Sequence, residues 1–168
     1  MLVAHMPAGY ITAKALKKES KPAHIIASLL FSIWPDLDLL YFYIFDKTKT
    51  FHHTYFTHLP VALLAALIVT LPLFRLKFFE KIKVYYILFF TNWLIHLILD
   101  TFTGGIMWFY PFDKTLVLFI KIPAVYKSWI LSFITHWSFG IEILIIAVSV
   151  ILLVKTKKGR CQTQTSYI

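Results

Sequence analysis

The sequence predicts an all-α membrane protein, a polytopic bundle of about four transmembrane helices with an N-terminal segment that could be re-entrant. Two observations support this fold class. Of the 168 residues, 59% are hydrophobic and only 15% are charged, which is far more apolar than is usual for a soluble domain of this length. The apolar residues also form four stretches, separated by loops that hold most of the Lys, Arg, Asp and Pro: 23–45, 59–74, 84–99 and 129–154.

The four stretches differ in how well they match the thickness of a bilayer. Residues 23–45 and 129–154 are long enough to cross a hydrocarbon core of about 30 Å. Pro35 interrupts the first of them by removing a backbone donor, which predicts a bend. Residues 59–74 and 84–99 hold 16 residues each, or roughly 24 Å of helix. We therefore expect these two helices to use flanking residues or to lie in a thinned bilayer.

The distribution of positive charge predicts an orientation for the helices. The chain has 17 Lys and Arg residues and a formal net charge of +9. Twelve of the 17 lie within 14–21, 75–83 and 155–160, and five lie in the two alternate loops. The positive-inside rule then predicts that both termini are cytoplasmic. Because a bilayer accounts for the charge, we expect no nucleic-acid partner.

The two ends of the chain carry further expectations. Residues 1–13 lack a leading basic region and a small-residue cleavage site, so we expect the N-terminus to be retained. Residues 1–154 are predicted to form a single membrane-embedded domain, followed by a basic, polar cytoplasmic tail, 155–168, that could recruit a protein partner. The single cysteine, Cys161, lies in this tail, which excludes an intrachain disulfide.

Costly polar side chains fall in the outer half of the predicted domain. His96 and Asp100, within LIHLILDTFTG, are four residues apart, so they share one helical face and can bind one ion. The stretch WPDLDLL places Asp36 and Asp38 in an apolar run, where each carboxylate costs roughly 2.5–3.5 kcal/mol at the bilayer centre. The loop FHHTYFTHLP adds three imidazoles: His52, His53 and His58.

Each feature alone also has a structural explanation. A His–Asp pair can be a hydrogen bond between helices, and loop histidines are comfortable at headgroup level. Because three costly features share one side, we interpret them together as a metal- or proton-handling site. Imidazole and carboxylate ligands without thiolate favour zinc, with manganese or iron as alternatives, over magnesium or calcium.

Three other ionisable residues are not assigned to this site. His136 and Glu142, in the last apolar stretch, are six residues apart and face different sides of a helix. His24, which lies close to Pro22, is expected at the membrane interface. The sequence contains no G-x-S-x-G, P-loop or dinucleotide-binding motif, so those classes of enzyme are excluded.

Four motifs between about residues 5 and 112 resemble a known family: VAHMPAG, WPDLD, HTYFTH and HLILDTFTGGIMWFYPF. This family comprises bacterial inner-membrane-associated, metal-dependent hydrolases, whose founding member is described as LexA-binding. It is distantly similar to zinc-dependent phospholipases C. The resemblance implies six metal ligands: His5, Asp36, His53, His58, His96 and Asp100. It also implies that Asp38 acts as a ligand or base.

The chain departs from this family in two respects. Family members usually have Arg and Gly where this chain has Thr54 and Tyr55, and His52 is an extra donor nearby. The predicted topology also leaves His5 on the cytoplasmic side, away from the other ligand candidates, unless residues 1–13 dip back into the membrane.

The leading hypothesis is a membrane-bound, metal-dependent hydrolase of the bacterial inner membrane. Metal-activated water would cleave a phosphoester of a lipid or of another membrane-associated substrate, with Asp38 and His52 as catalytic candidates. Two alternatives stay open: a non-catalytic membrane binding or regulatory protein, and a small transporter or proton-relay protein.

Overall fold

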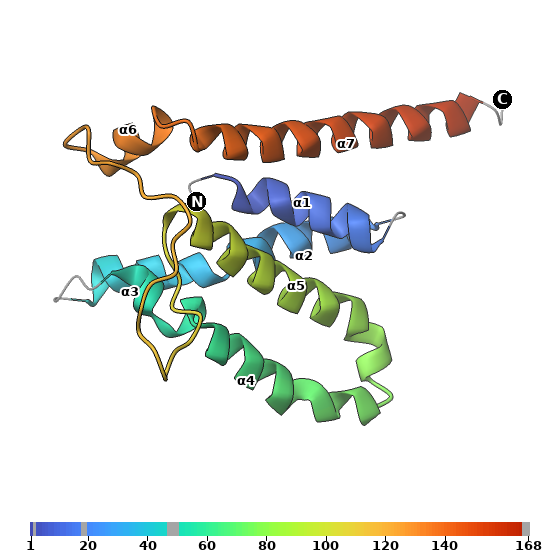
Figure 1. Ribbon diagram of the computed structural model, residues 1–168. Helices are drawn as coiled ribbons and strands as arrows, with labels where there is room; N and C mark the ends of the chain where they lie inside the picture. The colour runs from blue at the N-terminus through green and yellow to red at the C-terminus, as the bar shows by residue number, and fades with distance from the viewer. Residues whose placement is uncertain (2, 18–19, 47–50, 166–168) are drawn as a thin grey trace.

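The computed structural model describes residues 1, 3–17, 20–46 and 51–165, with side chains as far as residue 156 (Figure 1). Within these ranges the chain is helical and has no strand; an isolated antiparallel bridge joins Ile106 to Val117. The all-α prediction is therefore confirmed. Several positions used in the sequence predictions lie outside the described backbone or side chains: Lys18, Lys47, Lys49, Cys161 and the end of the tail, 166–168.

The described residues form seven α-helices and four short 3-10 helices, all four of which lie between α2 and α5. The α-helices are α1 (His5–Leu16), α2 (Pro22–Ser32), α3 (Asp38–Ile44), α4 (Pro60–Thr70), α5 (Phe79–Thr103), α6 (Trp129–Ile134) and α7 (Phe139–Thr165). The 3-10 helices are η1 (Pro35–Leu37), η2 (His52–Thr54), η3 (Phe56–His58) and η4 (Leu71–Arg75).

The four predicted apolar stretches are helical, and among the described residues two of them contain a continuous helix long and apolar enough to cross a membrane. These are α5, with 25 residues, and the apolar part of α7, Phe139–Thr156. The first stretch is bent by 55° between α2 and Pro35–Ile44, at the proline predicted to interrupt it. The second, Pro60–Arg75, is a shorter apolar helix. In the fourth, a separate short helix, α6, precedes the long one.

Helix α1 packs between α7 and the pair formed by α2 and α5, and α4 folds back along α5 (Figure 1). The α1–α2 contact is very close, because a Cβ at Gly9 would lie 2.7 Å from Ser32 Oγ. Ser28 Oγ donates across this contact to the Gly9 carbonyl at 2.8 Å, and Asn92 Nδ2 of α5 donates to Ser28 Oγ at 2.8 Å. Small and polar residues of this kind let membrane helices approach closely.

The packing of α1 changes the predicted position of the N-terminus. The amino group of Met1 contacts Asp100 at the end of α5, whereas the last residues of α7 lie at the opposite end of the molecule (Figure 1). Met1 and the last described residues of α7 therefore lie at opposite ends of the helices, an arrangement that differs from the predicted one, in which both termini face the same side. The reason is that α1 adds one more helix, packed beside α2, that was not counted among the four stretches.

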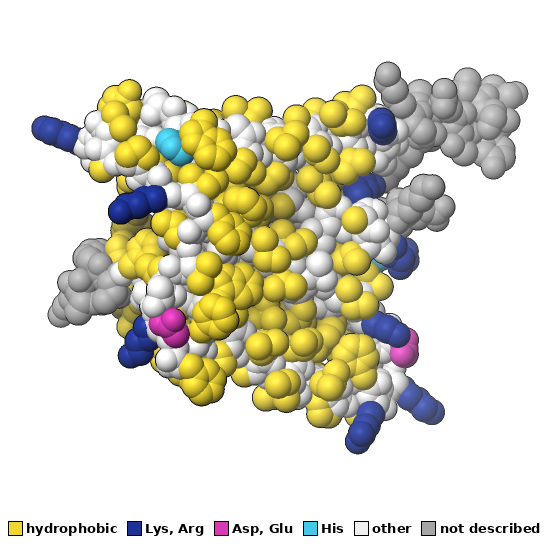
Figure 2. All heavy atoms as spheres, in the orientation of Figure 1, with side chains coloured by type: hydrophobic (Ala, Val, Ile, Leu, Met, Phe, Trp, Pro, Cys, Tyr) yellow, Lys and Arg dark blue, Asp and Glu magenta, His cyan; other side chains and the backbone are white. Residues whose placement is uncertain are grey.

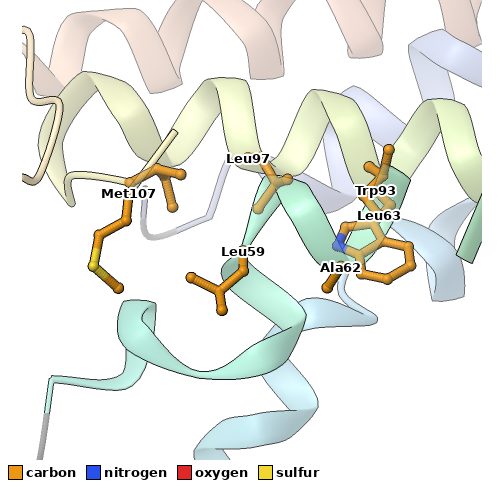
Figure 3. Close-up of a cluster of buried hydrophobic side chains, with 7 residues drawn as sticks. Leu59, Ala62, Leu63, Trp93, Leu97 and Met107 are labelled. Atoms are coloured by element: carbon orange, nitrogen blue, oxygen red, sulfur yellow. The ribbon is translucent and has the colours of Figure 1, made fainter. Parts of the chain in front are cut away.

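A buried apolar cluster joins the start of α4 to the middle of α5 (Figure 3). It includes Leu59, Leu63, Trp93 and Leu97, and the loop after α5 adds Ile106 and Met107. Trp93 also donates its indole N–H to the Thr57 carbonyl at 2.7 Å. This cluster fixes η3, which precedes α4, against α5.

The surface has the pattern expected of a protein embedded in a bilayer. Figure 2 shows hydrophobic side chains over most of one face, with Lys and Arg gathered toward the two ends of the helices. Basic residues that flank an apolar belt are typical of membrane proteins. We call the end that carries Lys14, Lys21, Arg75, Lys83 and Lys155 the lysine-rich end.

Candidate metal centre

Four side chains from three parts of the chain converge at the end of the bundle opposite the lysine-rich end. Each of them offers one ligand atom, and all four atoms lie within 4.8 Å of one another: Asp36, His58, His96 and Asp100. His58, His96 and Asp100 are at most 1% exposed, whereas the Asp36 side chain is 29% exposed. Asp36 is therefore the member of the group that faces the surroundings.

Local structure explains why these residues meet. Pro35 ends the regular course of α2 and begins η1, which carries Asp36. His96 and Asp100 are one turn apart on α5 and project from the same face, as their spacing predicted. His58 ends η3, directly before the helix that starts at Pro60.

The distances within this group match those expected around a single ion. His96 Nε2 lies 3.0 Å from Asp100 Oδ2 and 3.5 Å from Asp36 Oδ1. His58 Nε2 lies 3.5 Å and 3.8 Å from the same two oxygens, and the two Nε2 atoms are 3.3 Å apart. A tetrahedral zinc ion with bonds of about 2.0–2.1 Å separates its ligand atoms by about 3.3–3.4 Å.

The imidazole rings are oriented so that their Nε2 atoms face the centre of the group. His96 Nδ1 donates to the Ser32 carbonyl at 2.8 Å, and His58 Nδ1 pairs with Asp38 Oδ2 at 2.7 Å. Metal-binding histidines commonly use their second nitrogen in this way. Asp100 Oδ2 has no hydrogen-bond partner although it is buried. Several lone pairs therefore face one another, an arrangement that a cation stabilises.

A proton on His58 is one such cation. Burial alone lowers the pKa of the His58 imidazole, but its interactions with Asp100, Asp36 and Asp38 outweigh burial and raise the pKa to about 10. The neighbouring His53 lies farther from these carboxylates, and burial lowers its pKa to about 3. A metal ion that binds here must therefore displace a proton from His58.

The other two predicted metal ligands lie beside Asp100. His5 Nε2 is 3.2 Å from Asp100 Oδ1, and the His5 ring stacks on His96 with 3.8 Å between centroids. His53 Nε2 is 3.8 Å from Asp100 Oδ2. Both residues contact the group of four ligand atoms without belonging to it. The re-entrant alternative for residues 1–13 agrees with this position of His5.

The two residues predicted to be catalytic lie on the His58 side of the centre. Asp38 accepts hydrogen bonds from His58 and from the Thr57 hydroxyl, so it fixes the His58 ring. His52 is partly buried, with its ring centroid 4.2 Å from that of His53 and 5.5 Å from that of His58.

These three histidines form a second group that could hold an ion. The two groups compete for His58, because Asp38 already occupies its Nδ1 and leaves only Nε2 as a ligand. The first group, which contains two carboxylates, neutralises a divalent charge better.

A glycine makes room for His53. The His53 Nδ1 atom lies 3.1 Å from the Gly105 carbonyl, to which it can donate. A Cβ at Gly104 would lie only 2.0 Å from His53 Cε1. The two glycines that follow the His96–Asp100 motif therefore position an imidazole that is distant in sequence.

Sequence reasoning missed several contributors to this region. The carbonyls of Ser32 and Gly105 orient His96 and His53, and residue type gives no signal for a carbonyl. Glu142 was placed outside the site, yet it is fully buried and accepts a hydrogen bond from the Val3 N–H at 2.8 Å, which holds the segment before His5. A carboxylate in an apolar helix was the available signal.

The remaining two histidines lie away from the centre. His136 contacts the Ser138 hydroxyl at 2.9 Å. His24 is buried near the start of α2, with its ring edge-on to Tyr85.

The fold and the site together define a helical membrane protein with a buried His/Asp cluster that could bind a metal ion. Residues 1–163 match the family model described as YdjM inner membrane protein. The chain therefore belongs to the YdjM inner membrane protein family. Neither the curated proteins nor the solved structures gave a match. The family name confirms the predicted inner-membrane location, and it names no reaction.

Proposed function

We propose that this protein is a membrane-bound, metal-dependent hydrolase that cleaves a phosphoester of a lipid or of another membrane-associated substrate. The observation that supports it most directly is the spacing of four ligand atoms from Asp36, His58, His96 and Asp100. Two imidazoles and two carboxylates are a ligand set suited to zinc, and manganese or iron are alternatives. The resemblance to metal-dependent hydrolases supports the reaction class by analogy.

In this proposal some side chains bind the metal ion, and others accept or donate a proton. When bound, a divalent ion acidifies a water molecule and polarises a phosphoryl oxygen. Asp36, the exposed member, marks the side from which substrate and water approach. Asp38 holds His58 in place and accepts the proton released by hydrolysis. His52, beside His53 and His58, donates a hydrogen bond to the phosphoryl group.

His5 and His53 complete the predicted set of six ligands from either side of Asp100. His5 and His53 would be the ligands available to a second ion beside Asp100, and pairs of ions are common in phosphoesterases. We propose that at least one ion binds to Asp36, His58, His96 and Asp100. His5 and His53 would become ligands if a second ion binds beside the first.

We also propose an orientation and a domain organisation. The lysine-rich end and the C-terminal tail lie on the cytoplasmic side, in agreement with the positive-inside rule. The metal centre and the N-terminus then lie toward the opposite leaflet. Residues 1–154 act as one membrane-embedded domain, and the basic tail remains available to a protein partner.

Elemental analysis of the detergent-purified protein tests the metal centre before any substrate is chosen. We expect about one zinc, manganese or iron ion per chain in the wild type, and loss of that ion in Asp100→Ala. Asp113→Ala is the matched control, because Asp113 is exposed and bonds only locally to Thr115. A wild-type protein without transition metal, and unchanged when His96 and Asp100 are both replaced by alanine, would favour a non-catalytic binding protein.

A second measurement tests the reaction. Phospholipid vesicles and bis(p-nitrophenyl) phosphate are incubated with the metal-loaded protein, and phosphorylated products or nitrophenolate are measured. Activity that disappears with a chelator and in Asp100→Ala supports the hydrolase. A stoichiometric metal ion without turnover of either probe would instead identify a metal-binding protein.

A further inference from the structure

A groove lies on α5 apart from the metal centre. It has a volume of about 310 Å³ and is lined by Ile98 and Thr101 of α5 and, from the following segment, by Trp108, Phe109, Val117 and Phe119. Two backbone hydrogen bonds between Ile106 and Val117 fold this segment back on itself. Ligand sites range from about 300 to 1,000 Å³, so the groove is large enough for part of a small molecule.

The chemistry of the groove selects an apolar occupant. Thr101 is its polar residue, and its polar groups already have partners within the protein. The Thr101 hydroxyl donates to the Leu97 carbonyl at 2.8 Å and accepts from the Trp108 indole at 2.8 Å. The Thr101 carbonyl accepts from the Phe119 N–H at 3.0 Å. No buried polar group of the lining is left to recognise a headgroup or an ion.

The location of the groove indicates where such an occupant comes from. Ile98 and Thr101 belong to α5, one of the helices long and apolar enough to cross a membrane. Phe109 and Phe119 are 63% and 65% exposed, so the groove is open to the same surroundings as the outer surface of α5. We propose that it binds an acyl chain of a membrane phospholipid.

This lipid would not be the substrate held at the metal centre. A helix turns by about 100° per residue, so Ile98 points about 160° away from both His96 and Asp100. The groove and the metal centre therefore lie on different sides of α5. The proposed lipid site is independent of whether the protein is a hydrolase.

Even so, the lipid site and the metal centre share one segment of chain. The Gly105 carbonyl that faces His53 immediately precedes Ile106, whose backbone pairs with Val117 of the groove wall. An acyl chain bound in the groove would pack against this segment of the protein and help to keep the Gly105 carbonyl in place. Occupancy of the groove would thus support the position of His53 from the far side of the helix.

Native mass spectrometry of protein released from mild detergent micelles tests this proposal. The wild type should retain one more phospholipid molecule than variants in which a larger side chain fills the groove. Two such variants place the larger side chain on different walls of the groove: Ile98→Phe on α5 and Val117→Phe on the following segment. Leu94→Phe is the matched control, because Leu94 lies one turn earlier on α5 and, like Ile98, is 41% exposed. It should retain the same number of lipids as the wild type.

Size-exclusion chromatography shows whether each variant is folded. If Ile98→Phe is not folded, Val117→Phe provides the test of the groove. A wild type that retains no phospholipid would overturn the proposal. Retention that is equal in Ile98→Phe, Val117→Phe and Leu94→Phe would do the same, because the bound lipid would then lie elsewhere. Metal content, measured on the same samples, tests the metal centre separately.

Discussion

Replacing Gly104 by alanine tests whether His53 contributes to the metal centre. A Cβ at this position would lie 2.0 Å from His53 Cε1 and 2.6 Å from His53 Nδ1, whereas ordinary contacts begin at 3.4 Å. The ring must therefore withdraw by about 1.4 Å, the difference between 3.4 and 2.0 Å. A shift of this size breaks the 3.1 Å hydrogen bond to Gly105, because such bonds are lost beyond about 3.5 Å.

The expected effect on stability follows from overpacking a buried site. Such changes cost about 1–3 kcal/mol, and each kcal/mol lowers the Tm of a chain of this size by about 2–4 °C. Because His53 loses the partner that orients it, we also expect zinc affinity to fall by about 10–100-fold. Differential scanning fluorimetry measures the first effect, and competition with a chromophoric chelator measures the second.

Gly140→Ala is the matched control for this experiment. A Cβ at Gly140 would meet nothing within 4 Å, and Gly140 is the second residue of α7, away from the metal centre. We expect its zinc affinity to equal that of the wild type. If Gly104→Ala matches Gly140→Ala in both Tm and affinity, the steric reasoning is refuted. A lower Tm with unchanged affinity would remove His53 from the ligand set.

Two further predictions concern the metal centre, and a third concerns the contact between α1 and α2. Asp38→Asn replaces the charged partner of His58 and should weaken zinc binding by about 10–100-fold in chelator competition; an equal loss in Asp113→Asn would contradict this role. Zinc affinity should rise between pH 6 and 9, because the raised pKa of His58 keeps a proton on the imidazole that zinc must displace. Calorimetry in two buffers of different ionisation enthalpy should show proton release, and its absence at pH 7 would refute the assignment. Gly9→Ala should lower stability by about 1–3 kcal/mol, because its Cβ would lie 2.7 Å from Ser32 Oγ and 2.8 Å from the Ser28 carbonyl oxygen; an unchanged Tm would show that α1 and α2 separate easily.

The local features of the centre could be predicted from the sequence. The four-residue spacing of His96 and Asp100 placed them on one helical face, and Pro35 indicated the bend beside Asp36. Both predictions depend only on helix geometry and on the missing proline N–H, which act over a few residues. The apolar composition likewise predicted an all-α membrane protein.

The long-range features could not be predicted in the same way. Ser32 orients His96 through a backbone carbonyl, and every residue has a carbonyl, so the sequence carries no specific signal for it. The position of α1 depends on its close packing against α2 at Gly9 and on the hydrogen bond between these two helices. The topology predicted from the positive charges does not include α1 as a helix. The predicted topology therefore separates His5 from the other ligand candidates unless residues 1–13 are re-entrant, whereas the structure packs His5 beside Asp100.

The hydrogen bond from Val3 to Glu142 joins residues 139 positions apart. It ties the segment that carries His5 to α7, which is synthesised after α2, α4 and α5. During synthesis, α2, α4 and α5 can assemble around Asp36, His58, His96 and Asp100 before α7 emerges. The N-terminal side of the centre completes its packing only after α7 is made, so the order of translation separates an early, open form of the site from its packed form.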